Sequence, residues 1–184
     1  MPRVKGERRL EILKALAQML EQPKWGRITT AALAEKLDVS EAALYRHFAS
    51  KAQMYEGLIE FIESSVFTLA NKITADEADG RKQADKLLEM LLVFAEKNPG
   101  MVRVMTGDAL VGEHERLQTR MNQFYDRLEA TLKQSLRGAG DSDAAGRASM
   151  MLRYALGCLY QYAKSGFTRK PSETFSAQKR YLQS

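Results

Sequence analysis

The segment Thr29–Lys51, TTAALAEKLDVSEAALYRHFASK, constrains the fold more strongly than any other part of this chain. Hydroxyl residues stand where two short helices would begin, first at Thr29 or Thr30 and again at Ser40. Their side-chain oxygens can accept the backbone N–H groups that the first turn of a helix leaves without partners. Because Asp38-Val39 separates the two helical runs, the segment predicts two short helices joined by a tight turn.

Apolar residues of this segment recur at spacings that bring them to one side of both helices, where they would form a small core. These residues are Leu33, Leu37, Val39, Leu44 and Phe48. The second helix, expected from residue 41 to about 48, then turns Ala42, Tyr45 and Arg46 outward. Small residues near the start of a helix, followed by hydroxyl and cationic tips, suit insertion into the major groove of DNA. A surface helical hairpin without a ligand would show the same spacing, so a second feature must separate the two interpretations.

The distribution of positive charge supplies that second feature. Residues 1–51 carry ten Lys and Arg against six Asp and Glu, a net charge of +4, whereas the other 133 residues carry a net charge of +1. The excess lies on the predicted helix-turn-helix and on the basic arm before it, residues 2–9, which we expect to lack structure without a partner. Arg9 and its neighbours would follow a phosphate backbone or, alternatively, serve only as solubilising charge at a chain end. The distribution favours double-stranded DNA as a partner.

The rest of the sequence predicts helices and no strand of useful length. Apolar residues recur every three to four positions in stretches that are separated by polar or Gly- and Pro-containing breaks. These stretches cover about residues 5–21, 50–73, 86–97, 101–106, 110–136, 143–166 and 171–182. Asn98-Pro99-Gly100 is expected to end one helix, because proline clashes with the preceding turn and glycine tolerates positive φ. The result is an all-α fold of about nine helices, with an N-terminal head, 1–51, and a helical regulatory and dimerisation body, 52–184.

The stretch 143–166 is long and carries apolar residues on more than one face. Its small residues would let another helix approach closely, and the candidates for such a contact are Met151, Ala155, Leu159 and Tyr160. This contact could be internal to the chain, but we favour the interface of a homodimer.

Catalytic and metal-binding patterns are missing from the sequence. The two histidines, His47 and His114, lie far apart, no Cys-x-x-Cys pair offers zinc ligands, and no glycine-rich loop would hold a phosphate. We therefore expect no enzyme, no metal and no cofactor. The one cysteine, Cys158, suits a reducing compartment, no apolar run reaches the roughly 18 residues that span a bilayer, and no secretory signal is evident. These features predict a cytoplasmic protein without a membrane partner.

The stretch Ile28–Phe61 resembles the DNA-binding heads of TetR-family regulators, whose signature includes Leu44-Tyr45-Arg46-His47-Phe48 followed by Ser50-Lys51. More narrowly, Ser40–Phe48, Asn98–Gly100 and Leu117–Gln134 resemble the SlmA-type nucleoid occlusion factors of that family. The likeness extends to about residue 137. It implies a TetR-like fold and a nucleoid-associated homodimer that binds chromosomal DNA and blocks assembly of the tubulin-like division protein FtsZ.

The resemblance also assigns roles to residues of the predicted head. Thr29 and Thr30 would start the first helix at the DNA backbone. Ser40, Ala42 and Ala43 would lie at the start of the reading helix, although Ala43 could face inward instead. Four residues would contact phosphates, namely Tyr45, Arg46, His47 and Lys51. Arg46 could reach a base edge instead. The alternative for the histidine is to pack as a half-buried ring.

For FtsZ, the resemblance implies a groove between the long linking helix and the central helix, lined by Phe61, Met90, Lys97 and Asn98. Apolar anchors with cationic neighbours would suit an acidic and apolar tail. Met90 could instead belong to the core, and Lys97 could serve only the end of its helix. A cationic residue expected in this groove is missing at Leu69-Ala70. The alternative function is a ligand-gated TetR-family repressor, in which a small apolar molecule in the body would change the separation of the two heads.

Overall fold

The structure is a computed structural model and describes residues 5–22 and 26–183. Within these ranges the chain forms nine α-helices, one 3-10 turn and no strand, so the all-α prediction is confirmed. The elements are α1 (Lys5–Leu20), α2 (Thr30–Lys36), α3 (Glu41–Tyr45), α4 (Lys51–Asp76), α5 (Gly80–Lys97), α6 (Pro99–Met105), η1 (Asp108–Leu110), α7 (Glu115–Gly138), α8 (Ala144–Lys164) and α9 (Phe175–Gln183). Residues 2–4 of the predicted basic arm lie outside the described residues, and Arg9 stands on α1 rather than in a free arm.

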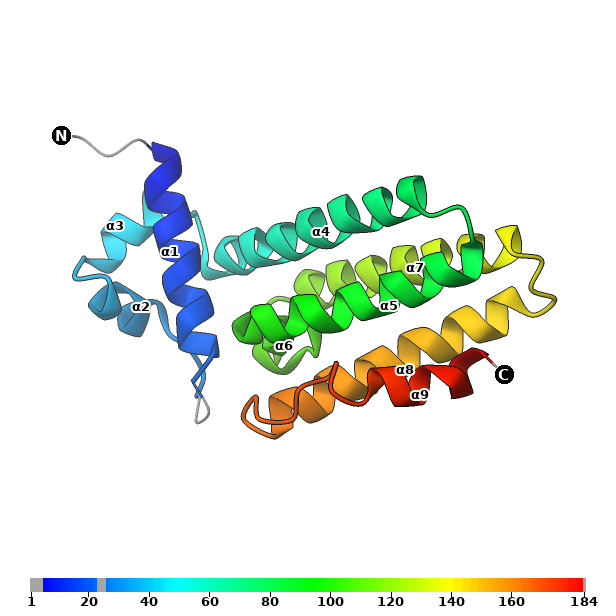
Figure 1. The fold of residues 1–184 in the computed structure, drawn as a ribbon. Coiled ribbons are helices and arrows are strands. Elements are labelled where there is room, and N and C mark those ends of the chain that lie inside the picture. The colour runs from blue at the N-terminus through cyan, green and yellow to red at the C-terminus, as the bar shows by residue number, and fades with distance from the viewer. Residues whose placement is uncertain (1–4, 23–25, 184) are drawn as a thin grey trace.

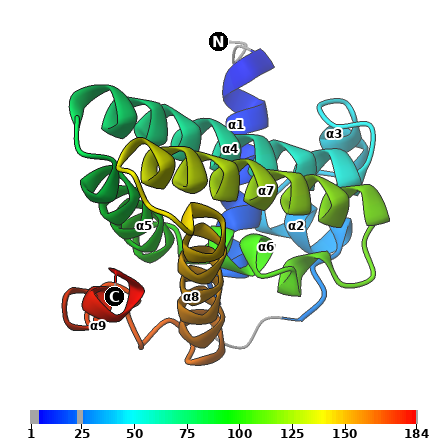
Figure 2. The same cartoon turned by 90° about the vertical axis from the view of Figure 1, so that its right-hand side faces the viewer.

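The helices form two groups (Figure 1). α1, α2 and α3 gather at one end, and α4 runs from them along the body. In the body, α4 packs on α5, α5 on α7 and α7 on α8. Seen along the body, α9 lies at its edge beside α8 (Figure 2). The group α1–α3 is therefore held on the body in two ways, through the continuous helix α4 and through a contact of α1 with α6.

The junction between α4 and α5 is much shorter than the sequence suggested. α4 continues to Asp76, and α5 already begins at Gly80 rather than near residue 86. The side chain of Asp79 caps α5 by accepting hydrogen bonds from two backbone N–H groups of its first turn. Gly80 does not break the helix. A Cβ at this position would overlap the backbone oxygen of Ser135 in α7, so glycine permits the close approach of the two helices.

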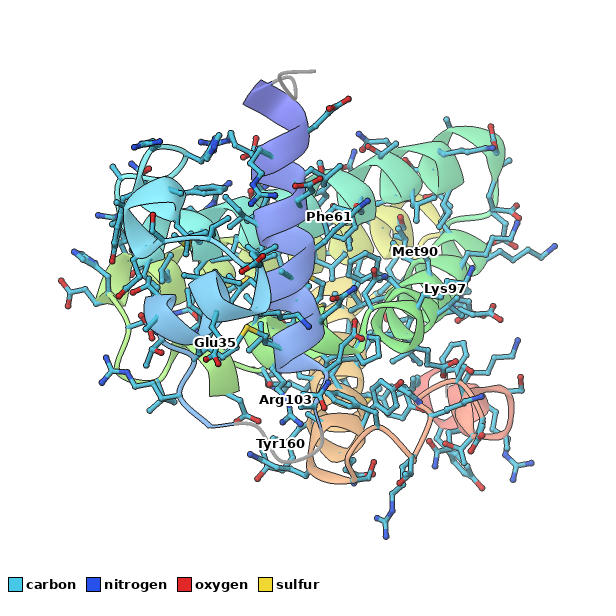
Figure 3. The ribbon with its side chains drawn as sticks, turned by 90° about the vertical axis from the view of Figure 1, so that its left-hand side faces the viewer. Glu35, Phe61, Met90, Lys97, Arg103 and Tyr160 are labelled. Carbon is cyan, nitrogen blue, oxygen red and sulfur yellow. The ribbon has the colours of Figure 1, made fainter. Side chains whose placement is uncertain are left out.

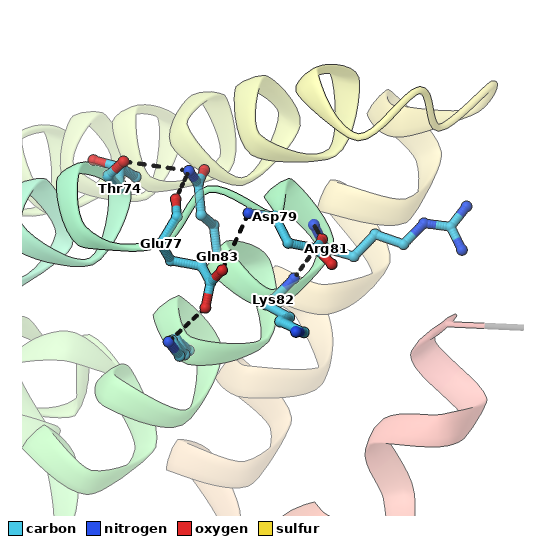
Figure 4. A network of polar contacts seen from close by, with 7 residues as sticks. Thr74, Glu77, Asp79, Arg81, Lys82 and Gln83 are labelled. Carbon is cyan, nitrogen blue, oxygen red and sulfur yellow. Dashed lines mark hydrogen bonds and ion pairs between the residues drawn. The ribbon is translucent and has the colours of Figure 1, made fainter.

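Polar contacts close this junction (Figure 4). Gln83 Nε2 donates hydrogen bonds to the backbone oxygens of Thr74 (3.3 Å) and Glu77 (2.6 Å), and the Glu77 carboxylate pairs with Lys86 at 2.7 Å. The hydrogen bond from Lys86 lowers the pKa of Glu77. Residues 77–86 are mostly polar, and half of them are exposed. The apolar period that marks a helix is therefore absent here, and the sequence placed the start of α5 too late.

Asn98 ends α5 as predicted, but the two residues after it do not interrupt the helical path. Pro99 is the first residue of α6, a position where the N–H that proline lacks would have no partner in any case. Gly100 is buried in α6 against α1, where a Cβ would overlap the backbone oxygen of Ala17. Its function is close packing of α6 on α1, not the positive φ that we expected.

Three further helix boundaries differ from the prediction. α3 ends at Tyr45 rather than near residue 48, α7 begins only at Glu115, and α9 begins at Phe175 rather than near residue 171. Leu110 thus belongs to η1 and not to the long helix after it. Between α6 and η1 the chain turns at Gly107, whose φ of +80° is a left-handed conformation that favours glycine.

The face of α8 that meets the body differs from the one that we expected. Met151, Ala155 and Leu159 are buried in the core of this same chain, so their side chains are not available to a second subunit, and the structure corrects that assignment. α8 turns these three toward the helices it packs on, mainly α7 and α5. Tyr160 points the other way and is 54% exposed. Met150, on the same outward face, is 40% exposed.

Candidate nucleic-acid interface

The helix-turn-helix begins each of its helices at a hydroxyl cap, as predicted. Thr29 Oγ1 accepts a hydrogen bond from the backbone N–H of Ala32 at 3.1 Å, and Ser40 Oγ accepts one from Ala43 at 3.2 Å. In the turn between the helices, Asp38 has a φ of +52°. Asparagine and aspartate tolerate this left-handed conformation better than most residues. The two caps and the turn therefore set the angle between α2 and α3 locally.

A small core holds α2 and α3 on α1. The side chains of Leu33, Leu44 and Phe48 are buried, and Leu37 and Val39 are half-buried beside them. All five were predicted from their spacing, and the structure confirms that they face one way. The opposite side of α3 is thereby left to solvent.

The outward side of α3 presents Glu41, Ala42, Tyr45 and Arg46, all exposed, while Ala43 is half-buried. Tyr45 is 44% exposed, and its hydroxyl donates to Thr30 Oγ1 at 3.4 Å. The Thr30 hydroxyl in turn donates to the Glu41 carboxylate. The prediction that Ala42, Tyr45 and Arg46 point outward is confirmed, and this link between α2 and α3 was not foreseen.

Arg9 and His47 meet where α3 ends. The Arg9 guanidinium lies over the ring of Phe48, 4.1 Å from its centroid, and donates to the backbone oxygen of His47 at 2.5 Å. The imidazole of His47 is half-buried, and its Nδ1 is buried without a hydrogen-bond partner among the described residues. This geometry agrees with the alternative of a half-buried ring, and a phosphate contact of His47 stays a prediction.

Lys51 occupies a more enclosed position than the sequence suggested. Its ammonium pairs with the Glu113 carboxylate, which is only 9% exposed, and lies 5.6 Å from the centroid of the Tyr55 ring. Arg27 Nε stands 4.0 Å from the same carboxylate. Burial, assisted by the nearby charge of Glu113, raises the pKa of Tyr55. A DNA phosphate would have to compete with Glu113 for Lys51. Sequence reasoning missed Glu113 because 62 residues separate the pair.

A second exposed surface follows the line where α4 packs on α5, and we call it the α4–α5 face. It comprises the four predicted partner residues Phe61, Met90, Lys97 and Asn98. Figure 3 shows the first three on one side of the molecule, beside α1. Phe61 is 45% exposed, and its ring centroid lies 6.2 Å from that of the buried Phe94. Met90 is half-buried and Lys97 is exposed.

Asn98 has a structural contact within this face. Its Nδ2 donates to the backbone oxygen of Phe94 at 2.8 Å, which satisfies a carbonyl at the end of α5. The face therefore combines a half-exposed aromatic ring, a thioether and an ammonium group. Leu69, further along α4, adds another exposed apolar side chain.

A buried arginine joins the end of α1 to the body. Arg103 in α6 is only 3% exposed, and it donates to the backbone oxygens of Leu20 (2.8 Å) and Gln22 (3.2 Å). Its guanidinium also lies 4.7 Å from the centroid of the Phe167 ring. Burial lowers the pKa of Arg103. Nothing in the run Met101–Met105 marked this arginine as a link between segments more than 80 residues apart.

A polar cavity lies at the far ends of α4, α5 and α7. This cavity has a volume of about 530 Å³, and amide and hydroxyl groups line much of it. The lining includes Asn71, Thr74, Gln83, Thr131 and Gln134. Over the described ranges no helix is long and apolar enough to cross a membrane, and no group of acidic, histidine or cysteine side chains is arranged to hold a metal ion.

Two solved structures of transcriptional regulators have a similar arrangement of helices. The TetR-family transcriptional regulator PfmR from Thermus thermophilus superposes with a TM-score of 0.77 over 94% of this chain and 97% of its own, at 20% identity. The transcriptional regulator FadR from Bacillus subtilis, solved with stearoyl-CoA, gives a TM-score of 0.73 over 94% of this chain and 96% of its own, at 11% identity. At such identities the likeness shows the fold alone. The arrangement of the helices is therefore a TetR-like fold, with α3 exposed at one end.

Sequence comparison narrows this class. Residues 12–58 match the family of bacterial regulatory proteins called tetR, and residues 80–184 match the tetracyclin repressor-like C-terminal domain of the SlmA-like type. The nucleoid occlusion factor SlmA of Alteromonas mediterranea is 52% identical over 97% of this chain and 95% of its own length. SlmA of Shewanella oneidensis is 49% identical over 97% of this chain and 94% of its own length. The chain belongs to the SlmA family of TetR-type proteins.

Proposed function

We propose that this protein is a nucleoid occlusion factor: a cytoplasmic homodimer that binds specific sites on chromosomal DNA and inhibits FtsZ assembly, and hence cell division, over the nucleoid. The observation that carries the proposal is the identity of about half of all residues, over nearly the full length, to relatives that bear this name. The exposed outward side of α3 supports the DNA-binding part independently of the relatives.

For DNA binding we assign different tasks to different residues of the head, 1–51. Thr29 and Ser40 use their oxygens as acceptors in the caps, so their hydroxyl protons are free to donate to phosphates. Arg9 and Arg46 are exposed cations of the head and supply salt-dependent affinity. Tyr45, whose ring is exposed, contacts a phosphate at the edge of the groove. The small side chains of Ala42 and Ala43 let the helix approach the base edges.

For dimerisation we assign the outward face of α8, in the body 52–184, in place of the buried residues expected at first. Met150, Arg153, Gly157 and Tyr160 recur at helical spacing on this face and are exposed. Two copies related by a twofold axis would cover each other's exposed Met150 and Tyr160. Their two α3 helices would then enter successive major grooves, about 34–36 Å apart, on a near-palindromic site.

For FtsZ we assign the α4–α5 face. A half-exposed Phe61 provides an apolar anchor, and the ammonium of Lys97 provides a positive charge nearby (Figure 3). An acidic and apolar tail laid across this face would bury the ring and pair with the ammonium. Met90, which is half-buried, extends the apolar floor.

The alternative, a ligand-gated repressor, requires a cavity for a small apolar effector in the body. The cavity of about 530 Å³ at the far ends of α4, α5 and α7 is lined largely by amides and hydroxyls, which do not suit such an effector, whereas a second cavity of about 390 Å³ beside Ile28, Tyr55 and Val111 is mainly apolar. The identity to the SlmA relatives, and not the cavities, is what favours the occlusion factor.

The decisive experiment measures two properties of one preparation. We expect the protein to retain specific genomic fragments in a gel shift at moderate salt. In the presence of those fragments, it should also lower the amount of GTP-assembled FtsZ that sediments. Retention of DNA with unchanged FtsZ assembly, together with release of the DNA by an apolar acyl compound, would support the repressor instead.

A further inference from the structure

Glu41 is an unexpected residue on a surface that faces DNA. It is the first residue of α3, and among the four side chains on the outward side of that helix it alone carries a negative charge. A carboxylate close to a polyanion lowers the affinity for every DNA sequence alike. A compensating gain is therefore expected in discrimination between sequences, which base contacts supply.

The carboxylate of Glu41 is held in place by a short chain of two hydrogen bonds. One of its oxygens, Oε2, accepts a hydrogen bond from the hydroxyl of Thr30, the first residue of α2. Oγ1 of Thr30 accepts in turn from the hydroxyl of Tyr45, one helical turn after Glu41. The chain Tyr45–Thr30–Glu41 thus fixes the direction of the carboxylate relative to both helices. The other oxygen, Oε1, takes part in no hydrogen bond to the described residues.

We propose that Glu41 reads a cytosine in each half-site through the free oxygen of this fixed carboxylate. The inference rests on the proposed function, in which α3 enters the major groove. An ionised carboxylate can only accept hydrogen bonds. On the major-groove edges, cytosine offers the N4 amino group as a donor, and guanine offers only the acceptors N7 and O6. Adenine has an amino group, but its N7 acceptor stands beside it and repels a carboxylate. Cytosine is therefore the base that Glu41 selects.

The test is a selection of binding sites from randomised duplexes, made with the wild type and with two variants. We expect the wild type to require cytosine at one position of each half-site, and replacement of that base pair to weaken binding about fivefold or more. Glu41→Gln should change the preferred base at this position to adenine, because a carboxamide both donates to N7 and accepts from N6. Glu41→Ala should remove the preference at this position and leave the other positions unchanged.

A matched control comes from α2. Glu35 is exposed near the end of that helix (Figure 3), so Glu35→Gln removes the same charge from the head without touching α3. It should leave the preferred base at every position unchanged. Thr30→Val removes the hydroxyl that holds the carboxylate, and it should weaken the preference for cytosine without replacing it by another base.

The outcomes separate this inference from the proposed function. Identical base preferences for the wild type, Glu41→Gln and Glu41→Ala, in proteins that all bind DNA tightly, would show that Glu41 only stabilises the head, and the inference would be overturned. Failure of the wild type to retard any duplex at low salt would instead remove the proposed function, and this inference with it.

Discussion

Replacing Phe61 by alanine should separate partner binding from DNA binding. Phe61 is 45% exposed on α4, so of the roughly 200 Å² that a phenylalanine side chain offers, about 90 Å² remain for a partner to cover. At about 25 cal/mol per Å² this area is worth about 2 kcal/mol. Phe61→Ala should therefore weaken binding of the partner about 30-fold. Its distance from α3 along α4 should leave DNA affinity unchanged.

The assay for Phe61→Ala is fluorescence anisotropy, with a labelled peptide of the FtsZ C-terminal tail and, in parallel, a labelled operator duplex. Val111→Ala is the matched control, because Val111 is 78% exposed but lies on the turn before α7 and not on the α4–α5 face. It should bind both probes like the wild type. A loss of peptide affinity smaller than threefold would refute the role of Phe61 as an anchor. A parallel loss of operator affinity would mean that the ring supports the fold instead.

Three further predictions concern stability, assembly and the interface with DNA. Arg103→Ala should lower the free energy of unfolding by about 3 kcal/mol in urea titrations, because it deletes charged hydrogen bonds to the end of α1; a change below about 1 kcal/mol would contradict this. Gly157→Arg should give a folded monomer in analytical ultracentrifugation, because a Cβ there has open space within the chain but would meet a second copy; a dimeric variant would exclude that face. Lys51→Met should cost about 1–3 kcal/mol of stability because it leaves Glu113 without its closest cation. If Lys51 also contacts a phosphate, the salt slope of DNA binding should fall by about one, whereas an unchanged slope would restrict it to the fold.

Local features of the head could be predicted from the sequence because they depend on neighbours in the chain. The caps at Thr29 and Ser40 need only an oxygen within reach of the next turn, and the structure has both. The burial of Leu44 and the exposure of Tyr45 follow from helical periodicity alone. The same reasoning found the all-helical fold.

Features that depend on distant segments could not be predicted in this way. The sequence cannot show that Gly80 and Gly100 touch α7 and α1, so both looked like helix breakers although they allow close packing. The partner of Lys51 is Glu113, on a turn that only the complete fold brings near. The two faces of α8 are both apolar enough for a core, and only the packing of α5 and α7 decides that Ala155 is inside and Tyr160 outside.

The contact between α6 and α1 bears on how the chain can be divided. The carbonyl groups at the end of α1 are satisfied by Arg103, and Gly100 seats α6 on the same helix. Cutting after residue 51 would strip α1 of these supports and expose its inner side to water. The DNA-binding head of this protein therefore depends on a helix of the body. A chimaera that joins this head to another protein must include α6 or an equivalent contact for α1.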